Sequence, residues 1–402
     1  MLFNIAIVVT TALIFYVLFE QIRLPGVLGM ILAGIVLGPS GFDFILSDVL
    51  RFSADLRSLA LIIILIRVGL GVSKSELNVV GLDAIKIGVL PVLFESIFIL
   101  FFAAYFFKMS YLMAAMLGLV ISSVSPAIVV PQMMDLKTKM AGSKKYIPTF
   151  LLAGAAIDNI FVITIFNSLV QTYQNENEHI VYSIAKIPLG IISGAILGAG
   201  IGYLFIGFFK KYHVRDTKKV IVFLIISIFL FKIEEILPIP ISGLVGIMGM
   251  GFIILEKYEA LAHRLSDKFN KVWIMAEIIL FVLVGAQVNL SVLAKVGPYA
   301  ILLIFVGLFG RAGGVLLSLY GKKLELNEKL FCIISSFPKA TVQAAIGAIP
   351  LALGLPFGEI ILAISVLSII ITAPIGAIGI RISRKYIISK NFATTTSVQT
   401  TL

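Results

Sequence analysis

The sequence predicts an all-helical membrane protein of about thirteen transmembrane helices, built as inverted repeats with two discontinuous helices. Its composition is the first reason, because 60% of the 402 residues are hydrophobic and only 13% are charged. A soluble domain carries roughly 25% charged residues. The second reason is a series of apolar runs, most of them near the ~20 residues that a spanning helix needs.

These runs set the domain organisation. Residues 1–390 form one polytopic membrane domain, and the Thr- and Ser-rich segment 391–402 is predicted to be a disordered tail. The predicted spans are 2–19, 24–40, 56–72, 84–107, 110–135, 146–170, 180–208, 218–233, 240–256, 272–289, 296–321, 328–354 and 358–380.

The basic residues give the orientation, since Lys and Arg collect in cytoplasmic loops. With Met1 outside, most of the 32 Lys and Arg residues fall in inside segments or in the C-terminal segment. The topology is therefore predicted to be N-terminus outside and C-terminus cytoplasmic. The net charge of +11 follows this loop pattern, so no nucleic-acid partner is expected. The outside segments hold Arg51, Arg57, Lys108, Lys186, Lys232 and Lys295.

Two of the runs are interrupted near their middle, one by SSVSP at 122–126 and the other by FPKAT at 337–341. A proline inside a helix removes a hydrogen bond, and a simple kink would explain either site alone. Two such sites in corresponding parts of the chain favour an inverted-repeat transporter with its binding site near the membrane midplane. The two repeat arms would be about 84–170 and 296–380, with the remainder as scaffold.

Six ionisable residues are clearly embedded within the predicted spans. Each costs at least ~2.5 kcal/mol at membrane depth, so each needs a partner or a purpose. There are three of each sign, which predicts internal pairing. They are Arg67, Glu95, Asp158, Glu277, Arg311 and Lys339.

Asp158 is the leading functional candidate among them, because a desolvated carboxylate can bind either a proton or a cation. A structural ion pair with Arg311 or Lys339 is the alternative. Glu95 and Arg311 hold similar places in the two arms with opposite sign, which predicts a core charge pair. Lys339 directly follows the proline of the second break and is placed to neutralise the negative ends of half-helix dipoles.

Several other classes of site have no support in the sequence. The three histidines fall in loops, so no transition-metal site is expected. No Walker A or dinucleotide motif occurs, which argues against nucleotide binding and ATP-driven transport.

Six segments together resemble the cation:proton antiporter superfamily, and most closely its NHA-type sodium/proton antiporters. They occur in the family's order and extend over about 24–385. The segments are LIRVGLG at 65–71, VLFES at 92–96, SSVSPAIVVP at 122–131, IPTFLLAGAAIDNIFVITIFN at 147–167, FGRAGG at 309–314 and FPKATVQAAIG at 337–347.

The resemblance implies a homodimer in the lipid bilayer, with a scaffold domain at the interface and a mobile core that carries two crossed broken helices. It implies exchange of Na⁺ or Li⁺ for H⁺ by alternating access, with no cofactor and no enzymatic activity. The ion-binding residues that correspond are Asp158, Asn159, Ser125 and Val124.

The sequence departs from the family at Asn159. In the family this position is the principal ion-binding carboxylate, preceded by an acid or an Asn. Either Asp158 has become the carrier, or the chain does not exchange protons, or Asn159 is a substitution that traps an inactive state. An amide offers a carbonyl oxygen to a cation but cannot release a proton.

Two other functions remain open at this stage. A sodium-coupled symporter of organic anions would require a roomy polar cavity, which the sparse polar residues do not favour. A non-transporting membrane protein that has kept the fold is supported by Asn159 alone. Richness in Ile and Lys fits a bacterial inner membrane.

Overall fold

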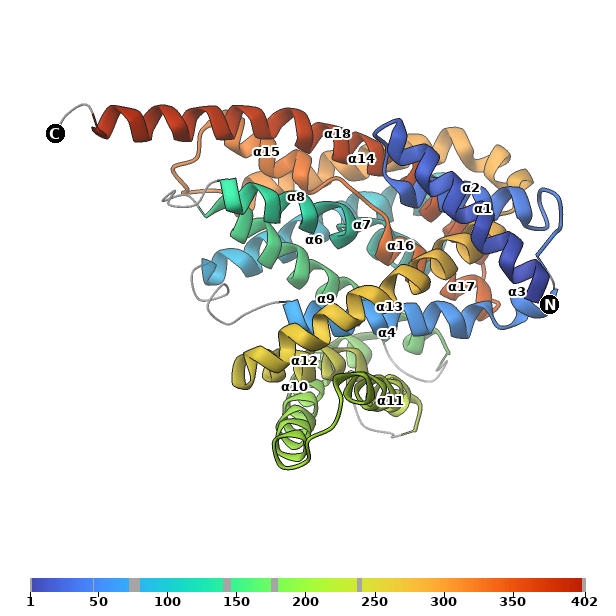
Figure 1. The fold of residues 1–402 in the computed structure, drawn as a ribbon. Coiled ribbons are helices and arrows are strands. Elements are labelled where there is room, and N and C mark those ends of the chain that lie inside the picture. The colour runs from blue at the N-terminus through green and yellow to red at the C-terminus, as the bar shows by residue number, and fades with distance from the viewer. Residues whose placement is uncertain are drawn as a thin grey trace.

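The computed structural model describes residues 2–45, 47–71, 80–139, 146–174, 180–236 and 241–399. Over these ranges helices are the only regular elements, as the sequence predicts (Figure 1). They are α1 (Leu2–Gln21), α2 (Gly26–Leu37), α3 (Ser47–Arg51), α4 (Ser53–Gly71), α6 (Leu82–Phe106), α7 (Tyr111–Ser122), α8 (Pro126–Lys139), α9 (Ile147–Gln174), α10 (Ile180–Lys211), α11 (Asp216–Ile236), α12 (Gly243–Lys257), α13 (Glu259–Ala286), α14 (Leu290–Ser318), α15 (Leu326–Ser335), α16 (Thr341–Ile346), α17 (Ile349–Ala352) and α18 (Gly358–Gln399).

Each predicted span coincides with one helix or with one interrupted helix. Within the described ranges, eight helical segments are long and apolar enough to cross a membrane, and shorter apolar helices such as α2 accompany them. The integral membrane class is therefore confirmed, while the count of thirteen spans stays a prediction. The helix α18 extends to Gln399, beyond its predicted span, and the disorder of 391–402 also stays a prediction.

The helix α13 begins at Glu259, well before the predicted start at 272. Its first turns are amphipathic, and Leu261, Leu265 and Phe269 recur at helical spacing with no exposed surface. A search for continuous apolar runs misses such a segment, because its other face is charged.

The two predicted arms have the same order of elements. The first arm is α6, the interrupted pair α7 and α8, and α9, and the second is α14, the interrupted series α15 to α17, and α18. Helices α6 and α14 pack side by side and join the arms. In Figure 1 the arms occupy the upper part of the molecule and α10 to α12 the lower part. The inverted symmetry of the arms stays a prediction.

The two interrupted helices meet at their breaks. Proline disfavours helical backbone in the residue before it, and the chain is non-helical from Ser123, which is extended, until α8 begins at Pro126. The backbone N–H of Ser125 in this first break donates to the carbonyl oxygen of Pro338 in the second, at 2.8 Å. The discontinuous helices therefore cross at the points where each loses its helical hydrogen bonds.

Arg57 differs from its predicted place in an outside segment. It lies in the second turn of α4 with only 2% of its surface exposed, and Nη1 donates to Oε1 of Gln287 at the end of α13. Gln287 in turn donates to the hydroxyl of Ser53. The count of basic residues placed Arg57 outside because it lies at the edge of the predicted span 56–72, and its burial arises from the contact of α4 with the end of α13.

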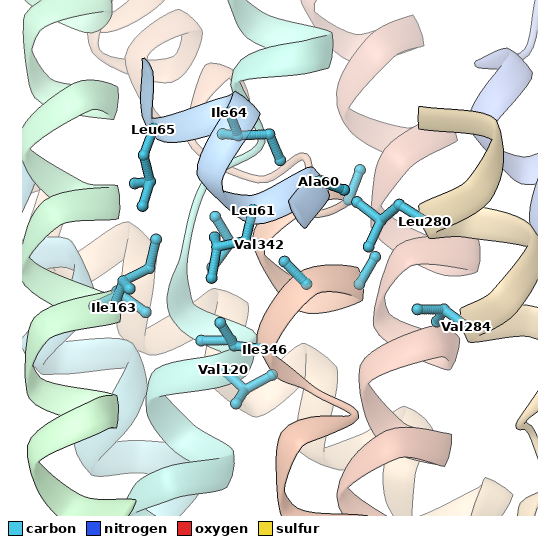
Figure 2. Close-up of a cluster of buried hydrophobic side chains, with 14 of the residues drawn as sticks. Ala60, Leu61, Ile64, Leu65, Val120, Ile163, Leu280, Val284, Val342 and Ile346 are labelled. Carbon is cyan, nitrogen blue, oxygen red and sulfur yellow. The ribbon is translucent and has the colours of Figure 1, made fainter. Parts of the chain in front are cut away.

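A cluster of apolar side chains, here called the apolar seal, lies between helices α4 and α13 and the two arms (Figure 2). The side chains of α4 and α13 face α7, α9 and the short helix α16, which carries Val342 and Ile346. All of the residues labelled there are buried. The apolar seal consists of Ala60, Leu61, Ile64, Leu65, Leu280 and Val284 on α4 and α13, and Val120, Ile163, Val342 and Ile346 on the arms.

A glycine substitution tests the packing of α2 on α13. A Cβ at Gly34 would lie 2.1 Å from the carbonyl oxygen of Val282, whereas a Cβ at Gly200 in α10 would meet nothing within 4 Å. We expect Gly34→Ala to lower the melting temperature in detergent. Gly200→Ala should leave it unchanged or raise it, since Ala favours a helix over Gly by ~1 kcal/mol. Equal effects of the two changes would contradict a direct backbone contact.

Candidate ion-binding site

Five sequence-predicted residues come together at the crossing of the two breaks. Asp158 and Asn159 are on α9, Glu95 on α6, Arg311 on α14, and Lys339 in the second break. Each has at most 1% of its surface exposed. The structure therefore gathers four charges and an amide in a place that water does not reach.

Close packing of α6 and α14 brings two of these charges together. A Cβ at Gly314 would lie 2.6 Å from the Cα of Pro91, so only glycine permits this approach of the two backbones. Arg311 is one turn before Gly314 and Glu95 one turn after Pro91. The glycines noted around Arg311 in the sequence thus serve to seat it against α6.

Arg311 bridges both carboxylates. Its Nη1 donates to Oε2 of Glu95 at 2.8 Å, and its Nη2 donates to Oδ2 of Asp158 at 2.7 Å. Nη1 also donates to the carbonyl oxygen of Ser122, the last residue of α7. The structure therefore contains the Glu95–Arg311 pair that the sequence predicts, together with the Asp158–Arg311 contact named as an alternative.

Lys339 completes the charge cluster. Its Nζ donates to Oε2 of Glu95 at 2.8 Å and to the carbonyl oxygen of Ser122 at 3.2 Å. Its backbone N–H donates to the hydroxyl of Thr372 on α18 at 3.0 Å. The ammonium thus lies at the negative C-terminal end of α7, the half-helix position expected for it. Two acids and two bases leave the cluster without net charge.

Asp158 is an acceptor in each of its described hydrogen bonds. Its Oδ1 accepts from the hydroxyl of Ser123 and from the backbone N–H of Val124, both at 3.0 Å. With Arg311 on Oδ2, this pattern is that of an ionised carboxylate. The hydroxyl of Ser123 also lies 2.6 Å from Oδ1 of Asn159, and its one hydrogen can serve only one of the two oxygens.

Some polar atoms next to this carboxylate have no partner. Within the described residues, Oγ of Ser125 and Nδ2 of Asn159 make no hydrogen bond although both residues are buried. The carbonyl oxygen of Val124 also accepts no described hydrogen bond. Buried groups are usually satisfied, so this concentration marks a place where a ligand can contribute.

Sequence analysis missed several participants in the site. Ser123 and Gln343 were quoted within motifs but given no role. Ser122 contributes its backbone carbonyl oxygen and Thr372 its hydroxyl, and only the fold brings these groups to the site. Gln343 could have been singled out, because it is a polar residue in an apolar stretch just after a break. The chain places Arg67 elsewhere, where its Nε donates to Oδ1 of Asn270 at 2.8 Å.

Glu277 does not join the charge cluster but lines a cavity of about 530 Å³. The cavity lies between α1, α2 and α13 on one side and α8 and α18 on the other. It includes Asp135 and Arg384, and it extends to Ala127, two residues from Ser125.

In the part of the chain that the structure describes, no group of three or more His, Cys, Asp or Glu side chains could hold a metal ion.

Two broken helices that cross beside a buried carboxylate are the arrangement of a secondary transporter. Comparison with known proteins agrees: the chain belongs to the sodium/hydrogen exchanger family, whose transmembrane model matches residues 8–383. The family is one of secondary transporters, so the chain is a transporter and not an enzyme. The resemblance found in the sequence motifs is thereby confirmed.

Similar proteins include two human exchangers. The chain is 30% identical to Sodium/hydrogen exchanger 9B1 of Homo sapiens over 94% of this chain and 76% of that protein. It is 28% identical to Sodium/hydrogen exchanger 9B2 of Homo sapiens over 88% of this chain and 68% of that protein. Its fold resembles the sodium proton antiporter MjNhaP1 from Methanocaldococcus jannaschii, with a TM-score of 0.79 and 15% identity over 96% of both chains.

A double-mutant cycle tests the charge cluster. Removing one partner of a buried ion pair costs roughly 3–5 kcal/mol, because the other charge is stranded. We expect Arg311→Gln to lower the melting temperature, and Glu95→Gln combined with Arg311→Gln to recover part of the loss.

The matched control is Arg384→Gln, which removes a partly exposed partner of Asp135. Its effect should stay within about 1 kcal/mol, as for exposed pairs. Strict additivity of the Glu95 and Arg311 changes would count against a direct interaction.

Proposed function

We propose that the protein exchanges Na⁺ or Li⁺ for protons across its membrane by alternating access, with Asp158 as the group that binds either ion. The observation that carries the proposal is the place of Asp158, buried at the crossing of two broken helices and surrounded by partnerless polar atoms. Family membership supports it, as does the printed function of the relatives.

The cation ligands that we propose are Asp158, Val124, Ser125 and Asn159. An ionised carboxylate has about four lone-pair positions, and three donors contact Asp158, so one position remains. The free carbonyl oxygen of Val124 and the hydroxyl of Ser125 add two neutral oxygens. Unwound carbonyls at broken helices are the usual ligands of Na⁺ in this kind of transporter.

Asn159 can supply a further oxygen by rotating its amide. With Nδ2 turned toward the hydroxyl oxygen of Ser123, the amide would donate there and the hydroxyl would donate to Asp158. In that arrangement two oxygens no longer compete for the one hydroxyl hydrogen of Ser123, and Nδ2 of Asn159 gains a partner. It also leaves Oδ1 of Asn159 free for a cation. Asn159 would therefore be a ligand and not a proton carrier.

The cavity and the apolar seal support access from one side at a time. Along α13 the cavity residue Glu277 is followed by the seal residues Leu280 and Val284, so the two lie at different depths. The cavity opens beside Arg23 and Asp135, near loops predicted to be cytoplasmic, and reaches toward Ser125. The cavity would thus be the cytoplasmic approach to Asp158, with the ligand residues themselves still buried in this conformation, while the seal closes the other side.

The remaining parts of the proposal rest on the family resemblance for the core and the dimer, on the distribution of Lys and Arg for the orientation, and on richness in Ile and Lys for the host membrane. The arms, about 84–170 and 296–380, would move as a core against a scaffold that forms a homodimer interface. The N-terminus would be outside, the C-terminus cytoplasmic, and the host a bacterial inner membrane. A transport-inactive homologue has only Asn159 in its favour. An organic-anion symporter would need an open polar chamber where this structure has paired charges.

The first functional prediction concerns Asp158. We expect Asp158→Asn to abolish exchange, because neither a proton nor a cation would find a carboxylate at the crossing. Exchange would be measured in liposomes with an internal pH dye after addition of Na⁺ or Li⁺. Asp216→Asn, which changes a carboxylate at the start of α11 and outside the cavity lining, should retain most activity. Wild-type rates in folded Asp158→Asn would show that the carrier is elsewhere.

The second concerns the charge moved in each cycle. Of the adjacent residues Asp158 and Asn159, only Asp158 can bind and release a proton. One proton per cation is therefore expected, and the cycle would be electroneutral. Asn159→Asp adds a second carboxylate and should raise either the rate or the voltage sensitivity, since one net charge couples to about 2.3 kcal/mol per 100 mV. The measurement is current on a solid-supported membrane after a Na⁺ jump. A sustained wild-type current larger than that of Asn159→Asp would defeat this account.

A further inference from the structure

Gln343 joins the two broken helices through both polar atoms of its side chain, Nε2 and Oε1. It lies on α16 with no exposed surface. Its Nε2 donates to the carbonyl oxygens of Ser123 at 2.6 Å and Ile121 at 3.2 Å, and its Oε1 accepts from the backbone N–H of Ala340 at 2.9 Å. One amide therefore caps the start of α16 and binds the end of α7 at the same time.

These bonds decide which carbonyl oxygens at the first break are free. Gln343 occupies those of Ile121 and Ser123, and Arg311 and Lys339 occupy that of Ser122. The carbonyl oxygen of Ser125 accepts from the first turn of α8. Among these break carbonyls only that of Val124 has no described donor, so it alone is fully available to an ion.

The number of available carbonyls bears on which cation fits. Discrimination between alkali cations depends on cavity size and on the number and field strength of coordinating carbonyl dipoles. A site with one free carbonyl beside a carboxylate provides few ligands in fixed positions, which suits a small cation. Release of the carbonyls of Ile121 and Ser123 would add ligands and loosen the break. The affinity for a larger cation would then rise more than the affinity for a small one.

We infer that Gln343 is a positioning residue for cation selectivity. By holding the carbonyls of Ile121 and Ser123 it leaves Val124 as the carbonyl ligand and keeps the break at its spacing from Asp158. This inference rests on the proposed exchange at Asp158. Gln343 itself does not touch the cation. A second bond between the breaks runs from Ser125 N–H to the Pro338 carbonyl oxygen. In this bond the donor belongs to the first break and the acceptor to the second.

The test compares cation selectivity in two variants. Gln343→Met keeps a similar volume and removes all three hydrogen bonds. We expect the ratio of apparent KM values for K⁺ and Na⁺ to fall by about tenfold, the size that loss of one or two hydrogen bonds gives. The assay is dequenching of a pH dye in liposomes, titrated separately with Na⁺, Li⁺ and K⁺.

Gln343→Glu covers the case in which the first variant fails to fold. A glutamate retains an acceptor for Ala340 and, when ionised, lacks the donors for Ile121 and Ser123. The K⁺/Na⁺ ratio should shift in the same direction. The matched control is Ser368→Ala, which removes a buried hydroxyl that bonds only within its own helix.

Two results would overturn the inference. A Gln343 variant that loses stability but keeps the wild-type K⁺/Na⁺ ratio would show a purely structural role. An equal shift in Ser368→Ala would show that any buried polar loss in the arms alters selectivity. A wild-type protein that exchanges no cation would instead overturn the proposed function, and this inference with it.

Discussion

The contact of Arg311 with both Glu95 and Asp158 is the interaction on which the rest of the structure depends. Charges in a membrane interior are tolerated when their desolvation is compensated by close, well-directed partners. A guanidinium has several donors in a fixed planar fork and keeps its charge at any accessible pH, so one side chain can hold two acids together. The close approach of α14 to α6 at Gly314 and the termination of α7 at Ser122 are both needed for that contact.

The two arms divide the hydrogen-bonding roles between them. The first arm supplies acceptors, namely Glu95, Asp158 and the carbonyls at the end of α7. The second supplies donors, namely Arg311, Lys339 and Gln343. One bond, from Ser125 N–H to the Pro338 carbonyl oxygen, runs the other way. Since each break has a polar group bonded to the opposite arm, neither half can shift alone without stranding buried polar atoms. The two arms are therefore bonded to each other as one unit.

Much of this could be predicted from sequence because it depends on local composition. Apolar runs predicted the helices, and proline with serine predicted the breaks. Isolated charges in apolar stretches predicted the site residues. What could not be predicted depends on contacts between distant segments. The burial of Arg57 and the early start of α13 arise from packing of amphipathic turns, which an apolar-run criterion does not detect. The bonds of Gln343 require the relative placement of α7 and α16, which no spacing within either helix encodes.

The distribution of unsatisfied groups separates the site from an ordinary buried ion cluster. A buried polar atom without a partner costs about 1–3 kcal/mol, so a structure under pressure for stability alone would remove such atoms. In the described part of the chain they belong to Glu95, Ser125, Asn159, Arg311, Ser335 and Thr341. All six residues lie in the charge cluster, beside it on α9, or at the ends of the two breaks. A site that must hold either of two ions needs unused hydrogen-bonding and coordinating capacity in each state, because groups that bind one occupant are idle with the other. The concentration of unsatisfied atoms here therefore supports the proposed binding site with exchangeable occupants, since a purely structural ion pair gives no reason for it.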